Sequence, residues 1–137
     1  EDKKMSNVLE IGTGCGYQTS ILSKLFTSVT TIERIKPLHD NSSYLLKKLG
    51  YNNVTFIYGD GFKGYKNNSP YDAILMTASP NDIPPNLIKQ LKPTGRIILP
   101  LNIGGSQKLY RVKNTRNGLL KKEVDDVLFV PMLEGVN

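Results

Sequence analysis

The residues best suited to chemistry form a glycine-rich loop near the start of the chain. The stretch NVLEIGTGCGYQT (7–19) places Gly12, Gly14 and Gly16 at alternate positions, between an apolar run and a helical pattern. Such a loop lets a ligand approach the backbone closely. It differs from the dinucleotide-binding pattern G-x-G-x-x-G, in which the third glycine comes one residue later than Gly16 does here. Glu10 precedes the loop. Its carboxylate would repel a phosphate and attract a sulfonium or ammonium group, which favours S-adenosylmethionine over NAD.

Two more acidic residues follow later strand-like segments. Glu33 ends the β-branched stretch SVTTIE (28–33), where a carboxylate can accept hydrogen bonds from both ribose hydroxyls. Asp60 and Gly61 belong to YGDGF, where the carboxylate could accept from an adenine amine. Each feature has a purely structural alternative: a tight glycine turn, an acidic residue near a helix N-terminus, and a D-G turn. Together the three indicate S-adenosylmethionine more specifically than any one does.

Alternating strand and helix patterns predict how these residues are positioned. Strands are expected at 7–11, 28–33, 53–59, 71–76 and 95–101, and helices at 17–26, 37–49 and 84–91. Asn117-Gly118 is a hairpin signal between two further apolar stretches. This order predicts a Rossmann-like α/β fold: a doubly wound, mostly parallel sheet with helices on both faces and an antiparallel C-terminal hairpin. In such sheets ligands lie beyond the carboxyl ends of the strands, where the glycine loop and the acidic residues fall.

Composition limits the classes of protein to consider. The 137 residues carry a formal charge of +6, which suits one domain with a basic surface. Because the lysines and arginines are spread out, we expect no nucleic-acid footprint. The single cysteine, Cys15, indicates a reducing, cytoplasmic compartment. No leader, membrane span or metal site is expected, and the sequence predicts no oligomeric state.

Several segments resemble the protein-L-isoaspartate O-methyltransferase family. They are VLEIGTGCGYQT, TIERI, GYNNVTFIYGDGFKGY, PYDAILMTASPNDIP, QLKPTGRIILPL and FVPML, which together span about residues 7–134. The resemblance implies a class I S-adenosylmethionine-dependent methyltransferase fold. It also implies methyl transfer to the α-carboxylate of isoaspartyl residues in damaged proteins or peptides, with S-adenosylhomocysteine as product. That reaction begins protein repair.

The same resemblance assigns roles by position. The cofactor-binding residues it implies are Glu10, Gly12, Thr13, Gly14, Gly16, Tyr17, Glu33, Arg34, Asp60 and Gly61, with Thr77 and Ala78 near the reacting centre. Glu10, Gly12 and Gly14 would line the methionine moiety, Glu33 the ribose, and Asp60 with Gly61 the adenine. No catalytic residue is assigned, because a carboxylate acceptor with a pKa of about 4 is already ionised at pH 7 and needs no general base.

Family members also begin with a further stretch of roughly 70 residues, within ordinary domain sizes. That stretch includes a segment around T-I-S-Q-P that closes over cofactor and substrate, and we expect residues 1–137 to be the cofactor-binding core without it. Two other functions stay open. One is methylation of RNA or a small molecule, although TASP (77–80) differs from the Asp/Asn-Pro-Pro-aromatic motif of amino-group methyltransferases. The other is a catalytically silent fragment that binds cofactor or a partner.

Overall fold

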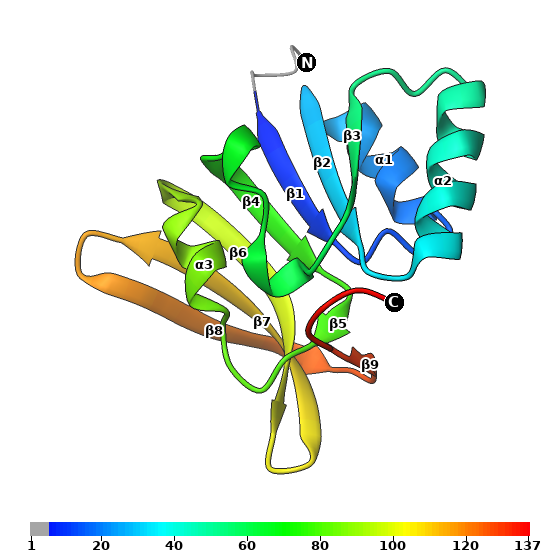
Figure 1. The fold of residues 1–137 in the computed structure, drawn as a ribbon. Helices are drawn as coiled ribbons and strands as arrows, with labels where there is room; N and C mark the ends of the chain where they lie inside the picture. Colours follow the sequence, from blue (N-terminus) through cyan, green and yellow to red (C-terminus); the bar gives the residue numbers. More distant parts are fainter. Residues whose placement is uncertain (1–5) are drawn as a thin grey trace.

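A seven-stranded sheet forms the centre of the chain (Figure 1). The computed structural model describes residues 6–137. The strands are β1 (Asn7–Ile11), β2 (Ser28–Glu33), β3 (Val54–Tyr58), β4 (Tyr71–Met76), β6 (Leu91–Ile103), β7 (Ser106–Thr115) and β8 (Gly118–Asp126). They lie in the order β3-β2-β1-β4-β6-β7-β8; the first five are parallel, and β7 and β8 are antiparallel additions at one edge. The expected mostly parallel sheet with an antiparallel hairpin is confirmed.

Helices cover the sheet from both sides. They are α1 (Tyr17–Leu25), α2 (Lys36–Lys48) and α3 (Pro85–Lys89), with short 3₁₀ turns η1 (Gly61–Lys63) and η2 (Lys66–Asn68). In Figure 1, α1 lies behind the sheet and α3 in front of it. The connections β1–α1–β2 and β2–α2–β3 run in one direction along the sheet, and β4–α3–β6 runs in the other. Right-handed crossovers in opposite directions place helices on opposite faces. Between residues 6 and 137, no helix is long and apolar enough to cross a membrane.

The alternation of side chains along β1 divides the core in two. Leu9 and Ile11 belong to the larger cluster, on the α3 side, together with Ile97 of β6. Val8 points the other way and packs with Leu22 of α1. Because successive side chains on a strand point to opposite faces, Glu10 is directed with Val8 toward α1. This orientation decides the environment of its carboxylate.

The structure differs from the sequence-based expectations at the third helix and at the strand that follows it. The predicted helix 84–91 is shorter, Pro85–Lys89, and the predicted strand 95–101 is longer, Leu91–Ile103. Leu91 therefore belongs to β6 and pairs with Tyr71. Pro93 lies within β6, where a bulged register between β4 and β6 accommodates it.

Two short features were not predicted. β5 (Ala78–Ser79) pairs in parallel with β9 (Val130–Pro131), and strands of two residues are too short to show periodicity.

The hairpin turn between β7 and β8 is centred one residue before the expected Asn117-Gly118, because Thr115 pairs with Gly118. Gly118 has φ of 107° and begins β8, whereas Asn117 does not have a positive φ. The glycine, rather than the Asn-Gly pair, provides the left-handed residue of this turn.

Candidate cofactor-binding site

The glycine loop connects β1 to α1 and turns toward the end of β2. Gly12, Gly14 and Gly16 have φ of 98°, 56° and 86°, a region that other residues rarely adopt. The Gly12 amide donates to the Ile32 carbonyl oxygen at 2.8 Å, and the Thr13 amide contacts the same oxygen at 3.3 Å. The alternate glycines therefore bend the chain across the carboxyl ends of β1 and β2, next to Glu33.

Gly12 also lies against the residue that follows β4. The Thr77 hydroxyl oxygen is 3.0 Å from the carbonyl oxygens of both Ile11 and Gly12, and it donates to this pair. A Cβ atom added at Gly12 would lie 2.1 Å from the Thr77 hydroxyl oxygen. Close approach of the backbone, as well as the positive φ, therefore requires glycine here. Thr77 thus ties the end of β4 to the glycine loop.

Glu10 is fully buried and directed at α1. Its carboxylate accepts hydrogen bonds from the hydroxyls of Thr19 at 2.5 Å and Thr31 at 2.7 Å, and from the Gln18 amide at 2.9 Å. Burial raises the pKa of Glu10, and these three donors oppose the shift only in part. In this structure the carboxylate therefore holds the first turn of α1 beneath the glycine loop.

The raised pKa of Glu10 predicts a pH dependence of stability. A carboxyl group whose pKa is higher in the folded than in the unfolded chain binds more protons when folded, so stability falls as pH rises. We expect the free energy of unfolding to decrease, relative to that of Glu10→Gln, as pH rises from the ordinary value of 4.5 through the raised pKa. Urea titrations of both proteins at a series of pH values measure this difference. A difference that stays constant with pH would contradict the assignment.

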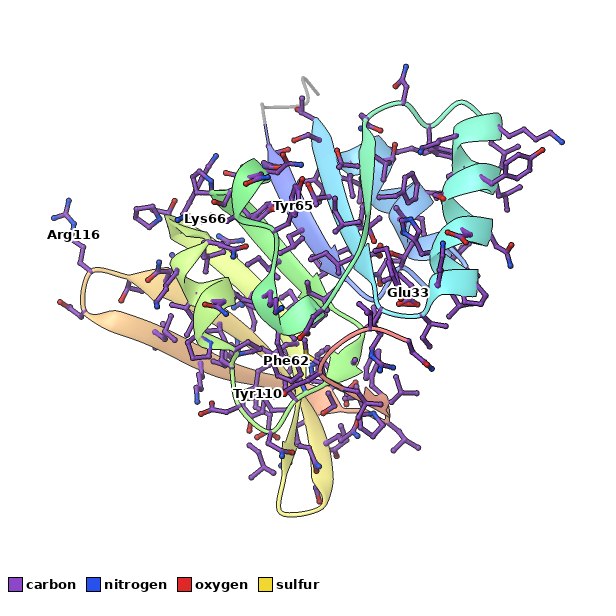
Figure 2. The ribbon with its side chains drawn as sticks, in the orientation of Figure 1. Glu33, Phe62, Tyr65, Lys66, Tyr110 and Arg116 are labelled. Atoms are coloured by element: carbon purple, nitrogen blue, oxygen red, sulfur yellow. The ribbon has the colours of Figure 1, made fainter. Side chains whose placement is uncertain are left out.

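Glu33 lies at the carboxyl end of β2, beside the first turn of α2 (Figure 2). One carboxylate oxygen accepts from the Arg34 amide at 3.1 Å. Burial raises the pKa of Glu33, while the backbone amides of Arg34 and Gly14 and the charge of Arg34 lower it. Unlike Glu10, Glu33 lines a cavity and can accept further hydrogen bonds there.

A cavity of about 430 Å³ opens beyond the ends of β1, β2 and β4. Its lining is mostly apolar and comes from five parts of the chain: Ile11, Gly12, Gly14, Ile32, Glu33, Arg34, Ile35, Leu38, Gly61, Thr77, Ala78 and the segment 130–133. Cavities of this size and character are typical of small-molecule sites. The position is the switch point of the sheet, where strand order reverses between β1 and β4.

The end of the chain forms one wall of this cavity. After β9, the Gly135 amide donates to the Asp60 carboxylate at 3.0 Å and the Asn137 amide donates to the Arg34 carbonyl oxygen at 2.7 Å. The other Asp60 oxygen accepts from the Phe62 amide at 2.9 Å. Asp60 therefore fixes η1 and the C-terminal segment, which holds the wall in place.

The structure separates the predicted site residues into two groups. Those that line the cavity are Gly12, Gly14, Glu33, Arg34, Gly61, Thr77 and Ala78. Those outside the lining are Glu10, Thr13, Gly16, Tyr17 and Asp60. Thr13 is buried with its hydroxyl 2.7 Å from that of Thr31, and Tyr17 is 74% exposed. The roles of both groups in binding stay predictions.

The lining residues 130–133 were not among the predicted site residues. They reach the cavity through the pairing of β9 with β5, and the hydrogen bonds of Gly135 to Asp60 and of Asn137 to Arg34 hold the segment there. Their signal in the sequence was the segment FVPML, which carries a family resemblance but no periodicity.

A mostly parallel sheet of this strand order, with a cavity at its switch point, is the Rossmann-like fold of S-adenosylmethionine-dependent methyltransferases. An rRNA methylase from Streptococcus thermophilus, at 21% identity, has the same fold with a TM-score of 0.58. More specifically, residues 2–137 match the profile of the protein-L-isoaspartate(D-aspartate) O-methyltransferase family, and the chain belongs to this family.

Individual relatives agree with this assignment. A protein-L-isoaspartate O-methyltransferase of Aliivibrio fischeri is 44% identical over 130 residues, 95% of this chain and 62% of the relative. One of Pseudomonas aeruginosa is 40% identical over 131 residues, 96% of this chain and 62% of the relative. The chain thus spans about 62% of the length of these relatives.

Two solved structures are similar over nearly the whole chain. A protein-L-isoaspartate O-methyltransferase superposes with a TM-score of 0.91 at 29% identity, covering 98% of this chain and 44% of its own. A Plasmodium falciparum protein described as a beta-aspartate methyltransferase, solved with S-adenosyl-L-homocysteine, superposes with a TM-score of 0.82 at 26% identity. The superposition covers 93% of this chain and 66% of the Plasmodium falciparum chain.

Proposed function

We propose that residues 1–137 are the cofactor-binding core, a single domain, of an enzyme that methylates the α-carboxylate of isoaspartyl residues in proteins and peptides. The observation that carries this proposal is the meeting of the glycine loop, Glu33 and Gly61 around one cavity at the switch point of the sheet. Family membership supports the acceptor class. The single cysteine favours a cytoplasmic location as part of the same proposal.

The cavity fits S-adenosylmethionine better than a phosphate-bearing cofactor. Its lining is largely apolar, its charged side chains Glu33 and Arg34 offset each other, and Glu33 can accept hydrogen bonds from ribose hydroxyls. The close approach at Gly12 and at Gly61 leaves backbone where side chains would otherwise fill the space. We assign Gly12 and Gly14 to the methionine moiety, Glu33 to the ribose and Gly61 to the adenine.

The reaction makes few chemical demands on the protein. S-adenosylmethionine supplies a methyl group activated by its positive sulfur, and an isoaspartyl carboxylate is already a nucleophile at neutral pH. The residues of this chain therefore need to orient the reactants and exclude water. Thr77 and Ala78 lie at the cavity wall after β4, next to the glycine loop, and we assign them to the boundary of the reacting centre.

A calorimetric titration with S-adenosylhomocysteine tests the cofactor site. We expect weak binding to the 137-residue chain, and no heat at about 0.1 mM protein would overturn the proposal. Gly61→Ala should weaken binding at least about tenfold, because its Cβ would lie 2.5 Å from Ile11 Cγ2 at the cavity wall. The matched variant Gly59→Ala meets nothing closer than 3.5 Å and should bind normally.

Methyl incorporation into an isoaspartyl peptide tests the acceptor. Because this chain spans 62% of its relatives, we expect slow turnover unless the remaining part of a relative's length is supplied. Binding of S-adenosylhomocysteine without any methylation, even then, would favour a silent cofactor-binding fragment. Methylation of RNA, and not of the peptide, would show that the acceptor is a nucleic acid and would overturn the proposed isoaspartyl acceptor.

A further inference from the structure

A groove lined by positive charges lies on the sheet away from the cofactor cavity. It has a volume of about 180 Å³ and is lined by Arg96, Arg111, Lys113, Leu120 and Lys122. We call these four cations and Leu120 the basic groove. Three neighbouring strands, β6, β7 and β8, contribute to it. The cations alternate with other residues along three strands and form no continuous basic run in the sequence, so the local pattern indicated no basic patch.

The strand register places the basic groove on the same face as α1. Ala73 and Leu75 of β4 pack in the cluster beneath α1, and Ala73 pairs with Arg96. Arg96 in turn pairs with Lys113 on β7. Directly paired residues on neighbouring strands share a face. The helices of this face, α1 and α2, contact β2 and β3, so within residues 6–137 no helix covers the groove.

Like charges face each other across the strands of the groove. Arg96 is opposite Lys113, and Arg111 is opposite Lys122. Like charges directly opposite each other destabilise a sheet. The ion pairs within the described part of the chain join other residues, and none of these four cations has an acidic partner or a side-chain hydrogen bond there. The groove therefore concentrates four positive charges that nothing in residues 6–137 neutralises.

We propose that the basic groove binds a compact polyanion carrying two or more phosphate groups. Oligophosphates carry closely spaced negative charges, and the two guanidinium groups, Arg96 and Arg111, can each bind a phosphate through two hydrogen bonds. Binding would relieve the repulsion between the paired cations. The site is independent of the methyl-transfer reaction, because its residues lie before the carboxyl ends of the parallel strands and outside the cofactor cavity.

Titration of the 137-residue chain with tripolyphosphate tests the proposal, with citrate as an anion of comparable charge but no phosphate. We expect tripolyphosphate to bind and to raise the thermal unfolding midpoint, and binding to weaken as salt increases. In the double variant R111Q/K122Q, the affinity for tripolyphosphate should fall at least about tenfold, because two charge-assisted contacts are lost. Both residues are exposed, so the substitutions should leave the fold and S-adenosylhomocysteine binding unchanged.

The matched control is R116Q/K121Q. It removes the same charge from exposed positions of the same hairpin: Arg116 is at the tip (Figure 2), and Lys121 is the neighbour of Lys122 that points to the other face. This variant should bind tripolyphosphate like the parent chain. An equal loss in both variants, equal binding of citrate, or no binding at 150 mM ionic strength would overturn the proposal. So would binding of a single-stranded oligonucleotide without tripolyphosphate binding, which would make the groove a nucleic-acid surface.

Discussion

Replacing Glu10 by alanine should lower the free energy of unfolding by about 2–4 kcal/mol, the larger of the stability effects expected for this chain. The carboxylate is 0% exposed and accepts from Thr19, Thr31 and Gln18. Truncation leaves these donors without their acceptor and opens a cavity between β1 and α1. Urea denaturation followed by circular dichroism measures the loss.

Glu10→Gln is the matched control for this prediction. The amide keeps the volume and one acceptor oxygen, and it removes the charge whose burial raises the pKa of Glu10. We therefore expect a loss below about 1.5 kcal/mol, the net value of one hydrogen bond. Equal losses in both variants would show that charge, rather than the acceptor atoms, stabilises the first turn of α1. No loss in Glu10→Ala would show that the hydrogen-bond network is unimportant.

Replacing Glu33 by glutamine should weaken S-adenosylhomocysteine binding about ten- to a hundredfold, the largest effect we expect on ligand affinity. The proposed ribose contacts are charge-assisted hydrogen bonds, and the amide can accept at only one atom. Because burial raises the pKa of Glu33, losing the charge should not lower the stability of the fold. Calorimetry gives the affinity, and urea denaturation gives the stability.

Asp40→Asn is the matched control for Glu33→Gln. Asp40 is an exposed acid on α2, paired with Lys36 at 3.0 Å, and its replacement removes the same charge outside the cavity. Its affinity for S-adenosylhomocysteine should stay within about twofold of the parent chain, because exposed charges are screened. Unchanged affinity in Glu33→Gln would refute the ribose assignment. Equal weakening in both variants would assign the effect to net charge.

Most secondary structure of this chain follows from its local pattern. The strands 7–11, 28–33 and 71–76 appear at the predicted bounds because their apolar, β-branched residues are buried in a parallel sheet. The second helix has local signals at both ends, Pro37 in its first turn and Gly50 after its end. The largest error lies where tertiary pairing overrides local signals, in the extension of β6 to Leu91. The predicted bounds 17–26, 37–49 and 53–59 differ from the structure by one residue at one end or at both.

The candidate site was predictable in part. Glycine is the residue that readily adopts positive φ, so three glycines at alternate positions predicted a sharp loop after β1, and all three have positive φ. The order of the strands predicted that Glu33, at the end of β2, lies beside the ligand site, and Glu33 lines the cavity. The direction of Glu10 toward α1 depended on which face of β1 each helix covers, and the local pattern contains no information on that choice.

The sequence by itself therefore determined the order of strands and helices, the glycine loop and the family. Only the tertiary structure brought the segment 130–137 to Asp60 and Arg34, and Arg96 beside Lys113. These contacts join residues distant along the chain. Local propensity fixes backbone conformation over a few residues, whereas such contacts depend on which strands become neighbours and in what register. The register is set by burying the apolar faces of all strands together, and no single segment contains that information.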